Sequence, residues 1–223
     1  MKVKICGIKT YAEALCAVEA GADMLGFNFY PPSPRYIIPA ECLRLQVKLQ
    51  TALHTIRQQV RMVGVFVNAT PAEVKRIFED CNLDLVQLSG DETPAMVDAF
   101  GEQAFKALRP VSVEDLFQSV ASYPQRGGPP AWLIDSYRAG EYGGTGLTAD
   151  WRLARRVSIE APILLAGGLN AANVAEAIRQ VQPWGVDVAS GVESQPGVKD
   201  PQKVIAFIQA ARSAQSDTAE EMR

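Results

Sequence analysis

The 223-residue sequence contains one histidine, His54, and this scarcity argues against a metal site built from histidine ligands. No apolar run reaches the roughly 18 residues that a membrane span needs. The opening segment MKVKICGIK has no hydrophobic stretch of the signal-peptide kind. The formal net charge is −3 and no basic stripe is present, which disfavours nucleic acid as a partner. We therefore expect a cytoplasmic protein with neither membrane nor nucleic-acid partners.

Cysteine is also sparse, and the four cysteines form no CxxC pair. A chain with 48% hydrophobic residues can bury a sizeable core without disulfide staples. We expect free thiols, as in a cytoplasmic protein. Cys16, Cys42 and Cys81 fall in helical patterns and are expected to be inert, whereas Cys6 ends an apolar run.

Short apolar segments alternate with amphipathic segments along the whole chain. The predicted strands are Lys2–Cys6, Asp23–Phe27, Arg61–Val67, Leu83–Leu88, Ala104–Leu108, Ala131–Asp135, Pro162–Ala166 and Gly185–Ala189. The predicted helices are Tyr11–Ala20, Ala40–Leu53, Pro71–Cys81, Thr93–Phe100, Val113–Ser122, Thr148–Val157, Ala171–Val181 and Pro201–Arg212.

Nearly continuous hydrophobic strands are typical of a parallel sheet that is covered on both faces. Eight strand–helix pairs in a chain of this length favour a single (β/α)8 barrel, a closed parallel sheet of the TIM-barrel type. An open, doubly wound sheet is the alternative. We expect residues 1–212 to form this one domain and residues 213–223 to form a polar, disordered tail.

In such a barrel the active site lies at the carboxyl ends of the strands. Side chains alternate along the first strand, so Lys4 and Cys6 should point into the barrel, with Cys6 at its mouth. A nearby cation lowers the pKa of a thiol, which makes Lys4 a candidate tuner of Cys6. Asp187 on the last strand should also face inward and can pair with Lys4. A small buried thiol and a purely structural pair are the alternatives.

Two further residues follow strand ends. Arg35 lies in a loop stiffened by three prolines, and its guanidinium suits a carboxylate or a phosphate. Asp135 ends an apolar strand and is partly removed from water there, which suits a general acid. A solvated arginine and a helix-capping aspartate are the alternatives.

Glycine-rich loops follow the last three strands. Loops after strands seven and eight form the usual phosphate site of this fold, where main-chain N–H groups receive the anion. Gly167 and Gly168 follow the seventh strand, and Ser190 and Gly191 follow the eighth. The loop 143–146, with Gly144, precedes the sixth helix and suits a close approach of the main chain to a ligand.

These pieces, in this order, resemble the phosphoribosylanthranilate isomerase family from Lys2 to about Ile208. The segments that carry the resemblance are Val3–Ile8, Gly26–Tyr36, Gly64–Asn68, Gly143–Gly146, Leu165–Asn170 and Val186–Glu193.

The resemblance implies an Amadori rearrangement of N-(5-phosphoribosyl)anthranilate, with no metal or cofactor. Asp135 would be the general acid and Cys6 the general base. Arg35 would hold the anthranilate carboxylate. Lys4, Gln87 and Asp187 are the other expected substrate-binding residues, and Gly144, Gly167, Gly168, Ser190 and Gly191 are the expected phosphate-binding residues.

One position departs from the family pattern, which usually reads Gln-Leu-His-Gly after the fourth strand. This chain has Ser89 in place of the histidine, and a hydroxyl replaces neither the charge nor the reach of an imidazole. The departure favours a catalytically silent metabolite-binding barrel as one alternative. Another is a histidine-pathway sugar-phosphate isomerase, although that relative uses an aspartate at the first strand end. Monomer and homodimer both stay open.

Overall fold

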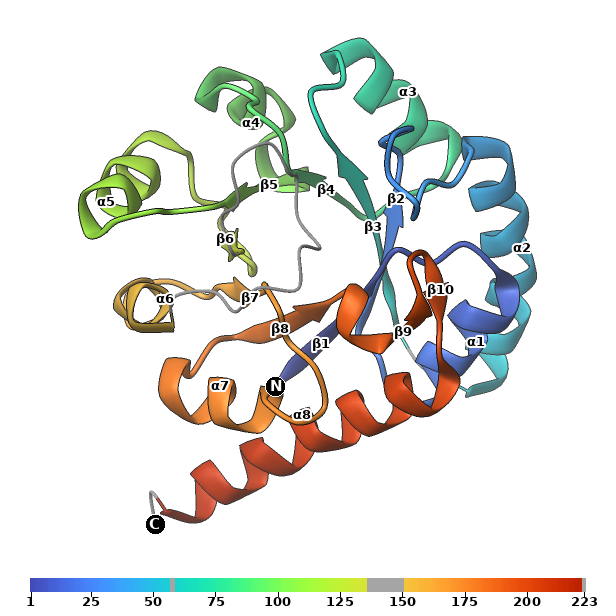
Figure 1. Cartoon of the computed structure of the whole chain (residues 1–223). Helices are drawn as coiled ribbons and strands as arrows, with labels where there is room; N and C mark the ends of the chain where they lie inside the picture. Colours follow the sequence, from blue (N-terminus) through green and yellow to red (C-terminus); the bar gives the residue numbers. More distant parts are fainter. Residues whose placement is uncertain (57–58, 136–150, 222–223) are drawn as a thin grey trace.

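The computed structural model describes residues 1–56, 59–135 and 151–221, and it shows a closed barrel of parallel strands (Figure 1). The strands follow one another in chain order, and β8 pairs with β1 to close the sheet. The barrel strands are β1 Lys2–Cys6, β2 Met24–Asn28, β3 Arg61–Phe66, β4 Leu85–Leu88, β5 Ala104–Leu108, β6 Trp132–Ile134, β7 Leu164–Leu165 and β8 Gly185–Val188. The predicted (β/α)8 fold is confirmed, and closure excludes the open sheet.

Helices surround the barrel on its outer face (Figure 1). They are α1 Tyr11–Glu19, α2 Pro39–Ile56, α3 Pro71–Asp80, α4 Pro94–Phe100, α5 Val113–Ser122, α6 Trp151–Ser158, α7 Val174–Val181 and α8 Pro201–Glu221, with short 3-10 turns at η1 Gly101–Gln103 and η2 Ser190–Val192. None of the helices in the described ranges is both long and apolar enough to cross a membrane.

Alternation along the strands divides the core into two parts. Val3 and Ile5 of β1 belong to the large cluster between the barrel and its helices, whereas Lys4 and Cys6 face inward. A smaller cluster fills the barrel interior and consists of Met24, Val63, Leu85, Phe105, Ala107, Leu133, Leu164 and Ala166. This interior packing leaves the carboxyl ends of the strands as the place for a site.

Five strands are shorter than the sequence predicted, with β6 and β7 shortened at both ends, and the last helix is longer. β6 and β7 lose their terminal residues from the ladder, although the N–H of Ala131 still donates to the Pro162 carbonyl at 2.8 Å. The last helix was predicted to end at Arg212, but α8 continues to Glu221. Residues 213–221 include two alanines, one glutamine and two glutamates, which favour helix, and the main chain there is helical.

Two of the helix starts show what a cap requires. The side chain of Thr70 accepts a hydrogen bond from the first turn of α3, and Pro71 follows it, as expected. The helix predicted from Ala171 begins later, although Asn170 Oδ1 accepts from the N–H of Ala172 at 2.9 Å. α7 begins at Val174 after Asn173, whose side-chain oxygen accepts from the N–H of Asn170 at 2.8 Å.

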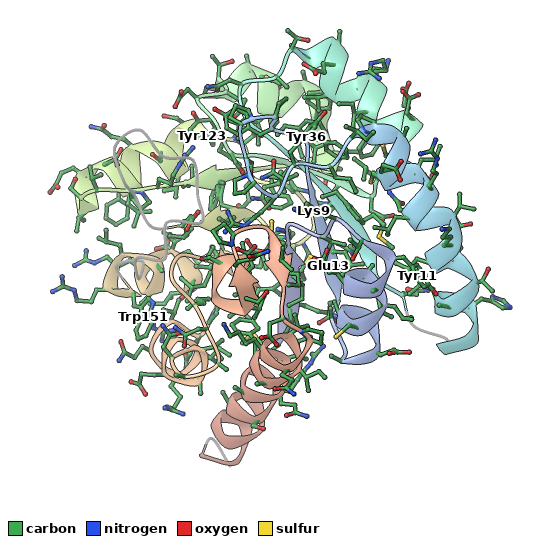
Figure 2. The ribbon with its side chains drawn as sticks, turned by 45° about the vertical axis from the view of Figure 1, so that its right-hand side comes forward. Lys9, Tyr11, Glu13, Tyr36, Tyr123 and Trp151 are labelled. Carbon is green, nitrogen blue, oxygen red and sulfur yellow. The ribbon has the colours of Figure 1, made fainter. Side chains whose placement is uncertain are left out.

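An unpredicted pair of antiparallel strands, β9 Glu193–Gln195 and β10 Val198–Lys199, follows β8. The N–H of Lys199 donates to Glu13 Oε1 at 3.1 Å, and Glu13 Oε2 accepts from the N–H of Lys9 at 2.8 Å. Figure 2 shows Glu13 and Lys9 side by side at the start of α1. The hairpin is thereby tied to the loop that follows Cys6.

Candidate active site

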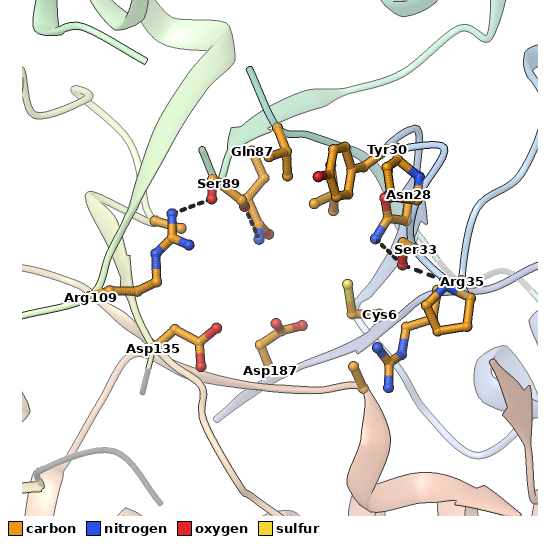
Figure 3. A pocket seen from close by; sticks show the side chains of 16 residues that line it. Cys6, Asn28, Tyr30, Ser33, Arg35, Gln87, Ser89, Arg109, Asp135 and Asp187 are labelled. Atoms are coloured by element: carbon orange, nitrogen blue, oxygen red, sulfur yellow. Dashed lines mark hydrogen bonds between the residues drawn. The ribbon is translucent and has the colours of Figure 1, made fainter. Parts of the chain in front are cut away.

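A cavity of about 410 Å³ opens at the carboxyl ends of the strands (Figure 3). Residues on seven of the eight barrel strands, or in the segments just after them, line it, among them Cys6, Arg35, Gln87, Arg109, Asp135 and Asp187. A second hollow of about 520 Å³ lies at the opposite end of the barrel, beside Lys2 and Trp184. Of its acidic residues, Asp23 pairs with Lys2 and Arg212, and Asp84 accepts a hydrogen bond from the N–H of Met62 at 2.6 Å, so both carboxylates are bound within the barrel's own structure.

Cys6 ends β1 and is 7% exposed at the cavity wall. Gly26 on the neighbouring strand makes room for the thiol, because a Cβ there would lie 2.9 Å from Cys6 Sγ and 3.0 Å from Lys4 Nζ. Burial raises the pKa of the Cys6 thiol, and Asp187 raises it further, while the charges of Lys4 and Lys199 oppose them. Lys4 was expected to bring this pKa below the usual value; the net shift is upward, because desolvation outweighs the cations.

Lys4 and Asp187 form the expected pair across the β1–β8 seam. Lys4 Nζ lies 2.8 Å from Asp187 Oδ1, and the two residues are register partners. Burial acts to lower the pKa of Lys4, but the negative charges of Asp187 and Cys6 outweigh it, and the pKa is raised. Lys4 is fully buried beneath the floor and does not itself line the cavity, whereas Asp187 does.

Asp135 directly follows β6 and is half-buried. Its N–H donates to the Leu108 carbonyl at 2.9 Å, which holds the residue at the rim. Figure 3 shows the carboxylates of Asp135 and Asp187 side by side, with the Cys6 thiol beyond Asp187. The predicted acid and base therefore share one cavity.

Arg35 also lines the cavity, but its guanidinium is paired within the protein. Arg35 Nε and Nη2 lie 2.7 and 2.9 Å from the two oxygens of Glu193, and Lys199 Nζ lies 2.9 Å from the same carboxylate. Burial raises the pKa of Glu193, but Arg35 and Lys199 outweigh it and lower the pKa overall. Gly7 permits this packing, because it has a φ of +82° and a Cβ would lie 2.7 Å from Arg35 Cδ.

Gln87, Ser89 and Arg109 form a corner where β4 and β5 end, here called the β4–β5 corner. Gln87 Nε2 donates to Ser89 Oγ at 3.0 Å. Arg109 Nη2 donates to the main-chain carbonyl of Ser89, and to that of Gly90 at 3.2 Å. Sequence reasoning missed Arg109, although its place just after an apolar strand is the signal that singled out Asp135.

The predicted phosphate loops meet beside β8. Gly167 and Gly168 have φ values of 93° and 66°. A Cβ on Gly191 would lie 1.9 Å from the Leu169 carbonyl oxygen, so the loop with Ser190 and Gly191 packs directly on the loop after β7. None of these four residues lines the cavity as described. Gly144 lies outside the described residues, as does the whole loop 143–146.

No cluster of three or more metal-ligating side chains occurs within residues 1–56, 59–135 and 151–221. The mouth of this closed β/α barrel brings together a thiol, two carboxylates and two arginines. These features define the class of protein as a barrel enzyme for acid–base chemistry on a small anionic molecule. Residues 3–210 match the family model described as N-(5'phosphoribosyl)anthranilate (PRA) isomerase. The chain belongs to this family.

Individual relatives agree over almost the whole chain. The N-(5'-phosphoribosyl)anthranilate isomerase of Trichlorobacter lovleyi is 46% identical over 215 residues, which cover 96% of this chain and 99% of the relative. The Thermotoga maritima enzyme superposes with a TM-score of 0.82 at 35% identity, covering 96% of this chain and 99% of that one. A family structure in complex with reduced 1-(o-carboxyphenylamino)-1-deoxyribulose 5-phosphate gives 0.79 at 34% identity, with the same coverage.

Proposed function

We propose that this chain is a phosphoribosylanthranilate isomerase in which Cys6 is the general base and Asp135 the general acid. Family membership supports the reaction, the conversion of N-(5-phosphoribosyl)anthranilate to 1-(2-carboxyphenylamino)-1-deoxyribulose 5-phosphate in tryptophan biosynthesis. The observation that supports the residue roles is that the thiol and the carboxylate line the same cavity from different strands.

The chemistry runs through one proton transfer from Asp135, one to Cys6 and a final tautomerisation. Asp135 donates a proton to the furanose ring oxygen as the bond from that oxygen to C1 breaks, and the nitrogen lone pair forms a C1=N Schiff base. Cys6 as thiolate then removes the proton from C2, and the electron pair of the C–H bond forms an enolamine. Proton return to C1 and loss of the C2 hydroxyl proton give the ketone. Each positioned acid or base contributes about 10²–10⁴-fold.

The environment of Cys6 combines opposing influences on the ionisation of the thiol. Burial raises the pKa of the thiol, whereas the charges of Lys4 and Lys199 act to lower it. Lys4 lies beneath the floor of the cavity, and Lys199 lies on the hairpin that also holds Glu193. The two cations therefore stabilise the charge that proton abstraction needs.

For the phosphate we propose the loops with Gly144, Gly167, Gly168, Ser190 and Gly191. The positive φ angles at 167 and 168 turn the main chain sharply after β7, which orients successive N–H groups in the way that anions require. We further propose that the protein acts in the cytoplasm, which the four free thiols support. A homodimer is the assembly that the dimeric relative from Thermotoga maritima suggests.

The test measures turnover of freshly prepared N-(5-phosphoribosyl)anthranilate, and the fluorescence of the substrate is used to monitor the reaction. The expected result is enzyme-dependent loss of the substrate signal, with no turnover of the two-phosphate substrate of the histidine pathway. A folded protein, as judged by circular dichroism, that binds the reduced product analogue but turns nothing over would be a silent binding barrel and would overturn the proposal.

A further inference from the structure

Two of the cysteines outside the active site lie against each other. Cys42 is in the first turn of α2, Cys81 directly follows α3, and both are fully buried. The thiol of Cys42 donates a hydrogen bond to the sulfur of Cys81. The interface of α2 and α3 therefore brings two sulfur atoms into direct contact, which is the first requirement for a disulfide.

The surrounding hydrogen bonds hold this pair of thiols in place. Gln46, one turn further along α2, donates from Nε2 to Cys42 Sγ at 3.3 Å and to the Cys81 carbonyl at 2.6 Å. The Cys81 thiol donates to the carbonyl of Pro39 at 3.4 Å. Both cysteines are thus bound to the start of α2, which keeps their side chains facing each other.

The two thiols differ in acidity. Their shared hydrogen bond raises the pKa of Cys42, and burial raises it further. The same hydrogen bond lowers the pKa of Cys81, and it outweighs the opposing effect of burial there. Cys81 therefore ionises first, beside a thiol that stays protonated. This is the arrangement of an attacking cysteine and a resolving cysteine.

Only a thin layer of structure separates the pair from solvent. Asp80 and Asn82, on either side of Cys81 in the chain, are exposed, and so are the neighbours of Cys42, Glu41 and Leu43. Both cysteines lie at helix ends, which open locally at small cost in free energy. A small oxidant can reach the Cys81 sulfur during such an opening.

We propose that Cys42 and Cys81 form a redox-responsive disulfide site that links α2 to α3, with hydrogen peroxide as the oxidant. The Cys81 thiolate attacks one peroxide oxygen, the O–O bond breaks, and hydroxide leaves, so that Cys81 becomes a sulfenic acid. Cys42 then attacks the Cys81 sulfur, the S–O bond breaks, and the oxygen leaves as water with the Cys42 proton. Two thiols and one peroxide thus give one disulfide and two waters, with two electrons passing from sulfur to oxygen.

This site is separate from the proposed catalysis. Neither Cys42 nor Cys81 is among the residues that line the cavity. The inference therefore holds or fails independently of the reaction at Cys6, and its test needs no measurement of activity.

The test treats the folded full-length protein with increasing hydrogen peroxide. Free thiols are then alkylated under denaturing conditions, and the peptides are mapped by mass spectrometry. We expect one disulfide, joining the peptides of Cys42 and Cys81, and dithiothreitol should restore both thiols. Cys16→Ser is the matched control, because it removes another helical cysteine and should leave the disulfide unchanged.

Thermal unfolding gives a second measurement. The oxidised wild-type protein should unfold at a temperature about 5 °C higher than the reduced protein, because the cross-link closes a long loop and restricts the unfolded chain. Cys16→Ser should keep this rise, whereas Cys42→Ser and Cys81→Ser should lose it. Circular dichroism checks the fold of the variants, and the peptide map of the wild-type protein decides the matter if a variant does not fold.

Three results would overturn the proposal. The first is a peptide map without the Cys42–Cys81 disulfide at peroxide concentrations that already oxidise Cys6 or Cys16. The second is a disulfide that forms only in denaturant, which would make the pair a product of the unfolded chain. The third is an equal rise in unfolding temperature in Cys81→Ser. In each case Cys42 and Cys81 would be packing residues alone.

Discussion

Two buried lysine–carboxylate pairs lie on opposite sides of the barrel and have different roles. Lys4 Nζ lies 2.8 Å from Asp187 at the β1–β8 seam, and Lys106 Nζ lies 3.0 Å from Glu92 at the β4–β5 side. Asp187 lines the cavity, whereas the side chain of Glu92 is only 1% exposed and lies outside it.

The surroundings of the two pairs explain the difference. Lys106 also donates to the carbonyls of Leu88 and Gly90, and Glu92 accepts from the N–H of Gly90 and of Asn68. Burial lowers the pKa of Lys106 and outweighs the charge of Glu92. At the other seam, the pKa of Lys4 is raised because Cys6 adds its negative charge to that of Asp187. One pair clamps the loop after β4, and the other is coupled to the reacting thiol.

The largest effect should come from removing the groups beside the first pair. Cys6→Ala and Asp135→Asn should each lower kcat at least about 100-fold, because each removes one positioned proton-transfer group. Steady-state kinetics measure this, and the reduced product analogue should still bind. Lys106→Met, as the control on the opposite side, should leave kcat within about threefold. Near-normal turnover in Cys6→Ala would remove the thiol from the mechanism.

The stability effects should run in the opposite order. Lys106→Met leaves Glu92 as an unpaired buried charge and should lower the free energy of unfolding by about 3–5 kcal/mol. Lys4→Met should cost less, about 1–3 kcal/mol, because Asp187 faces the cavity and can regain water. Urea denaturation of the two variants tests the order, and equal losses would contradict the contrast between the two pairs.

Lys4→Met should instead change the pH dependence of activity. The pKa of Cys6 is already raised by burial, and loss of the Lys4 charge should raise it further. The rising limb of kcat/KM against pH should therefore move to higher pH, with a loss on the order of tenfold at neutral pH. Lys106→Met should leave the limb unmoved. An unshifted profile in Lys4→Met would show that the lysine is structural only.

The smallest effect is expected at Tyr123, which covers the second pair. Its hydroxyl donates to the Glu92 carbonyl at 2.9 Å, and Lys106 Nζ lies 5.6 Å from its ring centre. Tyr123→Phe keeps the ring and loses the hydrogen bond, so stability should fall by about 1 kcal/mol with unchanged kinetics. Thermal unfolding measures the loss, and a drop in kcat would link this side of the barrel to the chemistry.

The alternation of apolar and amphipathic segments was sufficient to predict the closed barrel, because strand and helix periods are local properties of the chain. Strand-end position likewise singled out Cys6 and Asp135, since parallel strands end at one edge. Alternation along β1 and β8 placed Lys4 and Asp187 on the inward face, and their pairing followed from closure.

Other features of the site depend on contacts between distant segments, and only the tertiary structure decided them. The net direction of the Cys6 pKa depends on how deeply the thiol is buried against the charges around it. The partner of Arg35 is Glu193, 158 positions along the chain, and that pairing needs the unpredicted hairpin after β8. Arg109 acquires its place only when β4 and β5 lie together. Local sequence determines which way a side chain points, but burial and partners are properties of the folded whole.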